Sequence, residues 1–136
     1  MLSDNTKSLF ASAQCVGYFN ENGDATKEMC IPSNNEIYSK IELAINTVHA
    51  TSVFVASDHD HMIGKLRSYL AQRTKITKVV KLEEENPHLD LAILGRSSIF
   101  VGNCVSSYSA FVKRERDVNE LPSMFFGFPI QKHDEL

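Results

Sequence analysis

The chain has 136 residues, the usual size of one domain, and its 43% hydrophobic content is enough for a core. Charged residues make up 23% of the chain, with acidic and basic side chains interspersed and a formal net charge of −3. This balance argues against binding to nucleic acid or anionic lipid. No apolar run approaches the roughly 18 residues of a membrane span.

The last four residues are a known type of cellular address. His133, Asp134, Glu135 and Leu136 form a His-Asp-Glu-Leu tetrapeptide at the extreme C-terminus, which directs retention in the endoplasmic reticulum (ER). A lumenal protein enters through a signal peptide, but residues 1–5 have neither a charged region nor an apolar stretch. We therefore expect the natural start to lie upstream of Met1. The alternative is a retention signal that is never used.

The three cysteines, Cys15, Cys30 and Cys104, are an odd number for a compartment that favours disulfides. One bridge leaves one thiol over. Its partner could lie in an upstream segment, and an ordinary buried free cysteine is equally compatible with this count.

Residues 1–32 are polar and are expected to be a mostly irregular lead-in, with a short strand at 14–19. Ser33 and Glu36 then form a capping-box pattern, in which each side chain satisfies a free backbone donor of the other. Apolar residues follow at helical spacing and predict an amphipathic helix over residues 35–49. These are Ile37, Ile41, Ala44, Ile45 and Val48.

The next segments alternate between strand and helix patterns. Strands are predicted at residues 52–56, 76–82 and 98–101, and helices begin after residue 62, at residue 89 and at residue 106. The helix over 89–94 has Asp90 in its first turn and Gly95 at its end. This alternation predicts an α/β Rossmann-like domain with a parallel sheet, whose core spans residues 33–120. Residues 121–132 are expected to wrap across it.

In such a sheet, ligands bind beyond the carboxyl ends of the strands. The third predicted strand runs through Gly102 and Asn103 into a helix that starts near Ser106, Ser107 and Tyr108. A helix start offers free N–H groups and a positive dipole end, which suit a phosphate, while Tyr108 could cover a base or sugar. Simple N-capping by serine is the alternative interpretation.

Other polar residues also lie near the ends of predicted strands. Asp90 could accept hydrogen bonds from ribose hydroxyls or a guanine edge, although the residues alone favour a helix-start charge. The Asp58-His59-Asp60-His61 cluster matches no zinc spacing that geometry supports, and we expect no metal there. The absence of a Cys-x-x-Cys pair argues against an ER redox or folding factor.

The chain resembles the protein O-fucosyltransferases that modify EGF-like repeats. Residues 101–117 carry the most specific match, from Val-Gly-Asn-Cys-Val-Ser-Ser-Tyr to Lys-Arg-Glu-Arg-Asp. Essentially the whole chain takes part in the resemblance. The supporting matches are residues 14–18, 29–32, 53–58, 89–95 and 123–127.

The resemblance implies the C-terminal half of a GT-B glycosyltransferase, which binds GDP-fucose as donor substrate and transfers fucose with inversion to Ser or Thr of folded EGF-like repeats. It implies no cofactor and no metal, and a link to Notch signalling. Asp90, Ser106, Ser107 and Tyr108 are implied as donor contacts, with Tyr108 standing where the family usually has Phe. Further candidates are Ser57, Asp58 and Asn103.

The resemblance also implies a disulfide between Cys15 and Cys104, and an upstream partner for Cys30. The family's N-terminal domain is missing from this sequence, together with its His-Leu-Arg stretch. The arginine of that stretch stabilises charge on the leaving diphosphate. We therefore expect this chain to hold the donor but to be inactive alone. The alternative is a non-catalytic ER module that binds nucleotide or an EGF-like repeat.

Overall fold

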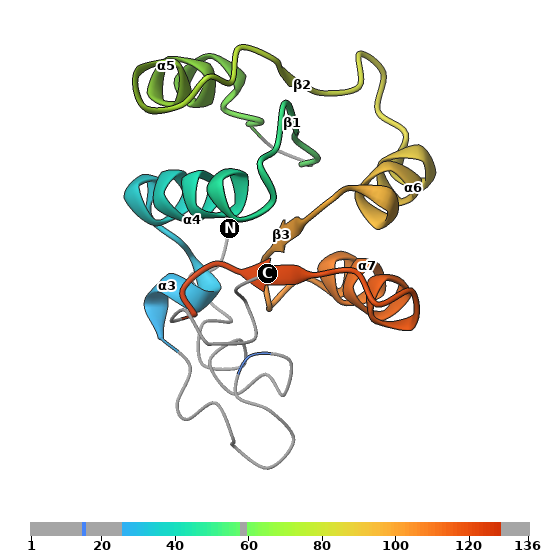
Figure 1. Cartoon of the computed structure of the whole chain (residues 1–136). Coiled ribbons are helices and arrows are strands. Elements are labelled where there is room, and N and C mark those ends of the chain that lie inside the picture. Colours follow the sequence, from blue (N-terminus) through green and yellow to red (C-terminus); the bar gives the residue numbers. More distant parts are fainter. Residues whose placement is uncertain (1–14, 16–25, 58–59, 129–136) are drawn as a thin grey trace.

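The computed structural model of the chain describes Cys15, residues 26–57 and residues 60–128 (Figure 1). In these ranges helices and short strands alternate, as the sequence predicts. The elements, in chain order, are α3 (Lys27–Cys30), α4 (Asn34–Val48), β1 (Val53–Phe54), α5 (Ile63–Arg73), β2 (Val79–Val80), α6 (Pro87–Arg96), β3 (Phe100–Gly102), α7 (Ser107–Val118) and β4 (Ser123–Phe125).

The described strands form two parallel pairs. β1 pairs with β2, placing Val53 opposite Val79, and β3 pairs with β4, placing Val101 opposite Met124. Each pair is joined by one helix, α5 for the first and α7 for the second, so each is a βαβ unit. The prediction of a parallel α/β fold is therefore confirmed.

Two details of the predicted sheet are corrected. The sequence predicted one sheet with longer strands, whereas the pairs β1-β2 and β3-β4 are separate in the described residues. The partner of β3 comes from the segment expected only to wrap across the domain. Pro122 and Gly127 flank it closely and hide the strand pattern in the sequence, but the Phe100 N–H donates to Pro122 O and the Phe126 N–H donates to Gly102 O.

Helix α4 begins where the capping residue predicts, but one arm of the capping box is absent. Ser33 Oγ accepts from the Glu36 N–H at 3.2 Å. The Glu36 carboxylate turns instead to the Gly127 N–H, and the Ser33 N–H donates to Glu28. The competing tertiary contact between Glu36 and the turn at Gly127 explains the difference. Glu28 lies in α3, a short helix within the lead-in that the sequence predicted as irregular.

Other predicted boundaries moved or lie outside the described residues. α6 extends from Pro87 to Arg96, so Gly95 is buried in its last turn rather than ending it. Asn86 caps its start by accepting from the Leu89 N–H, and Asp90 occupies the first turn as predicted. The strand predicted at 14–19, apart from Cys15, and the C-terminal tetrapeptide lie outside the described residues. No described helix is long and apolar enough to cross a membrane.

The apolar side chains gather in two clusters. The larger lies between α4, α5 and the β1-β2 pair, and its buried members are Ile45, Leu66, Leu70, Ile76 and Val79. The smaller contains Met29 and the disulfide between Cys15 and Cys104, with the rings of Phe125 and Phe128 packed against it. The bridge that the resemblance implied is thus present in the structure, while Cys30 is a buried free thiol.

Gly127 shows why the last described turn needs glycine. Its φ of +82° lies in the left-handed region, and a Cβ there would collide with the backbone of Glu28 and Met29. Lys40 from α4 donates to Phe128 O at 2.5 Å, beside the Glu36 bond to Gly127. Two charged side chains of one helix therefore fasten the C-terminal turn to the domain.

Arg116 of α7 is fully buried and joins its helix to three other segments. Its guanidinium donates to Leu94 O and Ser97 O at the end of α6, at 2.9 and 2.7 Å, and to Pro122 O before β4 at 2.7 Å. Burial lowers its pKa, but arginine still stays protonated at any ordinary pH. The cation therefore supplies the donor for Ser97 O and an additional donor for Leu94 O and Pro122 O, which also accept from other groups.

Replacing Arg116 by methionine should lower the free energy of unfolding by about 1–3 kcal/mol, because Ser97 O loses its guanidinium donor. Urea denaturation measures this change. The exposed Arg96 on α6 is the matched control, and Arg96→Met should change stability by less than about 0.5 kcal/mol. Equal effects of the two substitutions would contradict the role given to Arg116.

Candidate functional site

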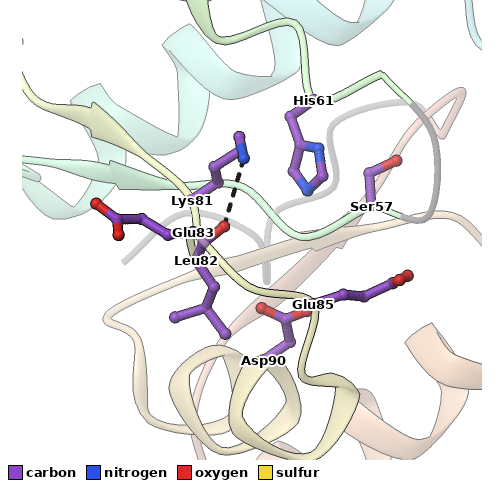
Figure 2. A pocket seen from close by; sticks show the side chains of 7 residues that line it. All are labelled: Ser57, His61, Lys81, Leu82, Glu83, Glu85 and Asp90. Carbon is purple, nitrogen blue, oxygen red and sulfur yellow. Dashed lines mark hydrogen bonds between the residues drawn. The ribbon is translucent and has the colours of Figure 1, made fainter.

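A polar pocket lies beyond the carboxyl ends of β1 and β2 (Figure 2). It has a volume of about 220 Å³. Its lining residues come from the loop after β1, the loop after β2 and the first turn of α6, as expected for a ligand site of an open parallel sheet. They are Ser57, His61, Lys81, Leu82, Glu83, Glu85 and Asp90.

The pocket carries donors and acceptors on different sides. Figure 2 shows Ser57, His61 and Lys81 on one side and Asp90 with Glu85 on the other. Lys81 Nζ donates to the adjacent Leu82 O at 3.4 Å, which is long for a hydrogen bond. Such an arrangement can bind a flat polar ring with acceptors on one edge and donors on the other.

The turn between β3 and α7 is held by its own polar groups. Asn103 Oδ1 accepts from the Val105 N–H at 3.0 Å, and Ser106 Oγ accepts from the Ser109 N–H at 3.2 Å. At Gly102 a Cβ would lie 2.6 Å from the Phe100 ring, so only glycine lets the strand enter this turn without a shift. Ser106 therefore caps α7, and Ser107, the first residue of the helix, is exposed.

Tyr108 connects the starts of α6 and α7. Its hydroxyl donates to Pro87 O at 2.7 Å. Burial raises the pKa of Tyr108, and the nearby Asp90 carboxylate raises it further, so the phenol keeps the proton that this bond needs. The α6 start, which supplies Asp90 to the pocket, is thereby tied to the α7 start.

The pocket includes only part of the set expected from the sequence. Ser57 and Asp90 line it, whereas Asn103, Ser106, Ser107 and Tyr108 lie outside it at the β3-α7 turn. Asp58 falls outside the described residues. The sequence interpretation missed five lining residues: His61, Lys81, Leu82, Glu83 and Glu85. The position of His61, Glu83 and Glu85 after predicted strands was a usable signal, whereas Lys81 and Leu82 fell inside the strand predicted at 76–82.

Among the described residues no group of three His, Cys, Asp or Glu side chains could hold a metal ion. His59 of the Asp58–His61 cluster lies outside the described ranges. His61 takes part in the polar pocket.

Comparisons with known proteins agree with one another. Residues 1–119 match the family model of GDP-fucose protein O-fucosyltransferase. Over 132 residues the chain is 42% identical to GDP-fucose protein O-fucosyltransferase 1 of Caenorhabditis elegans, covering 94% of this chain and 33% of that protein. The chain therefore spans about a third of the length of the relative.

Solved structures show the same similarity in three dimensions. The crystal structure of POFUT1 in complex with GDP (crystal form III) matches with a TM-score of 0.79 and 44% identity, over 87% of this chain and 33% of that one. POFUT1 in complex with GDP-fucose (crystal form I) matches with a TM-score of 0.79 and 43% identity, over 88% of this chain and 34% of that one.

The fold is thus an α/β unit that matches a portion of a GT-B type glycosyltransferase. The match of residues 1–119 to a family model identifies the family as well as the fold. The chain belongs to the GDP-fucose protein O-fucosyltransferase family.

Tyr108→Phe should cost about 0.5–1.5 kcal/mol of stability at pH 7, because Pro87 O loses its donor. Because the folded pKa is raised, this contribution is complete below the ordinary tyrosine pKa of about 10 and declines as pH rises through the folded value. Urea unfolding of both proteins at pH 7 and at a pH above about 10 measures this contribution. Tyr38→Phe is the control, since its hydroxyl has no partner among the described residues; a loss equal to that of Tyr108→Phe would contradict the role of the bond.

Proposed function

We propose that this chain is the donor-binding part of a peptide-O-fucosyltransferase, which transfers fucose from GDP-fucose to Ser or Thr of EGF-like repeats with inversion. The observation that carries the proposal is the polar pocket beyond β1 and β2, in a chain similar over 88% of its length to POFUT1 bound to GDP-fucose. The pocket lies where parallel α/β folds bind nucleotides.

The donor spans two neighbouring parts of this surface in the proposal. The pocket, at about 220 Å³, is smaller than the roughly 300–1,000 Å³ of sites that enclose drug-sized ligands, so it receives only the base end of GDP-fucose. Asp90 accepts hydrogen bonds there, and Ser57 lines the opposite side of the pocket. Asp58, outside the described residues, stays a candidate from the sequence alone. The diphosphate lies at the start of α7, where free N–H groups and the helix dipole favour an anion.

Ser106, Ser107 and Tyr108 stand at this helix start, and Asn103 precedes it. The exposed Ser107 hydroxyl donates to a phosphate oxygen, while Ser106 keeps its capping bond to Ser109. Tyr108 presents an aromatic face beside the donor, with its hydroxyl fastened to Pro87.

Transfer itself needs groups beyond this chain. In the proposed mechanism an arginine from a His-Leu-Arg stretch of the N-terminal half stabilises the charge that develops on the leaving GDP. Donor binding by the C-terminal half alone does not lower the barrier, because only interactions that strengthen in the transition state do so. This chain is therefore proposed to bind GDP-fucose without transferring fucose.

The setting of the reaction is part of the same proposal. The C-terminal His133–Leu136 tetrapeptide supports retention in the ER lumen, after entry through a signal peptide upstream of Met1. The Cys15–Cys104 bridge fits that oxidising compartment. Folded EGF-like repeats, including those of Notch-type receptors, are the proposed acceptors, and the transfer is proposed to need no metal.

Calorimetric titration of the oxidised chain with GDP and GDP-fucose, in buffer containing EDTA, tests the proposal. Saturable binding of both ligands at one site is the expected result. A folded sample, checked by circular dichroism, that binds neither ligand would overturn the assignment of a donor site to this chain.

Ser107→Ala should weaken GDP binding about tenfold, since a hydrogen bond to a charged group contributes about 1.5–3 kcal/mol. Its effect on stability should be small, because Ser107 is exposed. Ser106→Ala should leave GDP affinity nearly unchanged but lower the free energy of unfolding by about 1 kcal/mol, because α7 loses its cap. Calorimetry and urea denaturation of both variants check this, and unchanged GDP affinity in Ser107→Ala would remove that residue from the site.

A further inference from the structure

We propose that Lys81 determines base specificity by donating a hydrogen bond to O6 of guanine, opposite Asp90. This inference rests on the proposed function, because it concerns the base end of the same donor. It assigns a role to a residue that the sequence interpretation did not single out.

Guanine has two chemically different edges. O6 and N7 are acceptors, whereas the ring N–H and the exocyclic amino group are donors. A pocket that reads guanine therefore needs a donor on one side and an acceptor on the other. Adenine has an amino donor at position 6, where guanine has O6, so a cationic donor at that place discriminates between the two bases.

The lining of the pocket has this polarity. Lys81 has three donor hydrogens and no acceptor, and an ionised Asp90 has acceptors only. The two residues come from different elements, the end of β2 and the first turn of α6, and Figure 2 shows them on opposite sides of the pocket. His61 and Ser57 lie on the Lys81 side and can donate as well as accept, so Lys81 is the side chain there that only donates.

The backbone that carries Lys81 is well fixed. Lys81 directly follows Val80, whose carbonyl accepts from the Val55 N–H at 2.9 Å in the β1-β2 pair. Its ammonium group, in contrast, is exposed and has only the long 3.4 Å bond to Leu82 O among the described residues. A ligand acceptor can replace that bond at little cost, so a fixed strand end presents an available donor.

His61 borders the same side of the pocket on a strained turn. The neighbouring Met62 has a φ of 56°, in the left-handed region, and its N–H donates to Asp60 Oδ1 at 2.9 Å. Met62 also packs on the larger apolar cluster, which holds the turn in place. Strained backbone of this kind concentrates at ligand sites. This turn places the imidazole of His61 on the Lys81 side of the pocket.

Affinities for GDP, IDP and ADP, measured by calorimetry on the full chain and on Lys81→Met, test the inference. IDP retains O6 but lacks the 2-amino group, and ADP lacks O6. Lys81→Met should weaken GDP and IDP binding about tenfold alike, as expected for one hydrogen bond to a charged donor. ADP affinity should stay within about twofold or increase, because adenine has an amino donor and no acceptor at position 6.

The matched control is Lys78→Met, which removes the same charge from an exposed lysine just before β2 that does not line the pocket. It should leave all three affinities unchanged. An equal loss for GDP, IDP and ADP in Lys81→Met would assign Lys81 to the phosphates or to general attraction, and would overturn the inference. Unchanged GDP affinity in Lys81→Met would also overturn the inference, but it would leave the proposed function standing. If the unmodified chain binds no GDP, the proposed function fails as well.

Discussion

The second half of the fold depends on the hydrogen bonds that the buried guanidinium of Arg116 donates. Its bonds reach the end of α6, the loop before β3 and the turn before β4, so a single cation holds three chain segments together. Because α6 also supplies Asp90 to the pocket, the same cation positions a wall of the candidate site. Its partners are carbonyl and hydroxyl groups, so no buried carboxylate has to be desolvated with it.

The α6 wall of the pocket and the start of α7 are held to each other by hydrogen bonds. α7 carries Arg116 near its end and Tyr108 at its start, and both side chains bond to carbonyl groups of α6 or of residues next to it. The two helices therefore pack along each other, with Tyr108 joining their N-terminal ends and Arg116 reaching the last turn of α6. A donor with a base at one end and a diphosphate at the other suits a site built in this way.

The sequence predicted the helices and the parallel α/β class well, because those features depend on local apolar spacing and on capping residues such as Ser33. It failed where tertiary contacts decide. The capping arm of Glu36 was lost to Gly127, and β4 was hidden because its residues pair with β3 through a contact distant in sequence. Of the residues that line the pocket, the sequence singled out Asp90 but not Lys81. A lysine after a strand has no distinctive pattern until the fold places it across from a carboxylate.

The bridge between Cys15 and Cys104 joins residues that are 89 positions apart, so it closes a covalent ring around β1, β2, α6 and β3. The exposed loop of Glu83, Glu84, Glu85 and Asn86 lies inside that ring. A protease that cuts this loop once would leave both pieces attached through sulfur. Nicked and intact molecules would then have almost the same mass under oxidising conditions, and would separate only after a reductant opens the ring.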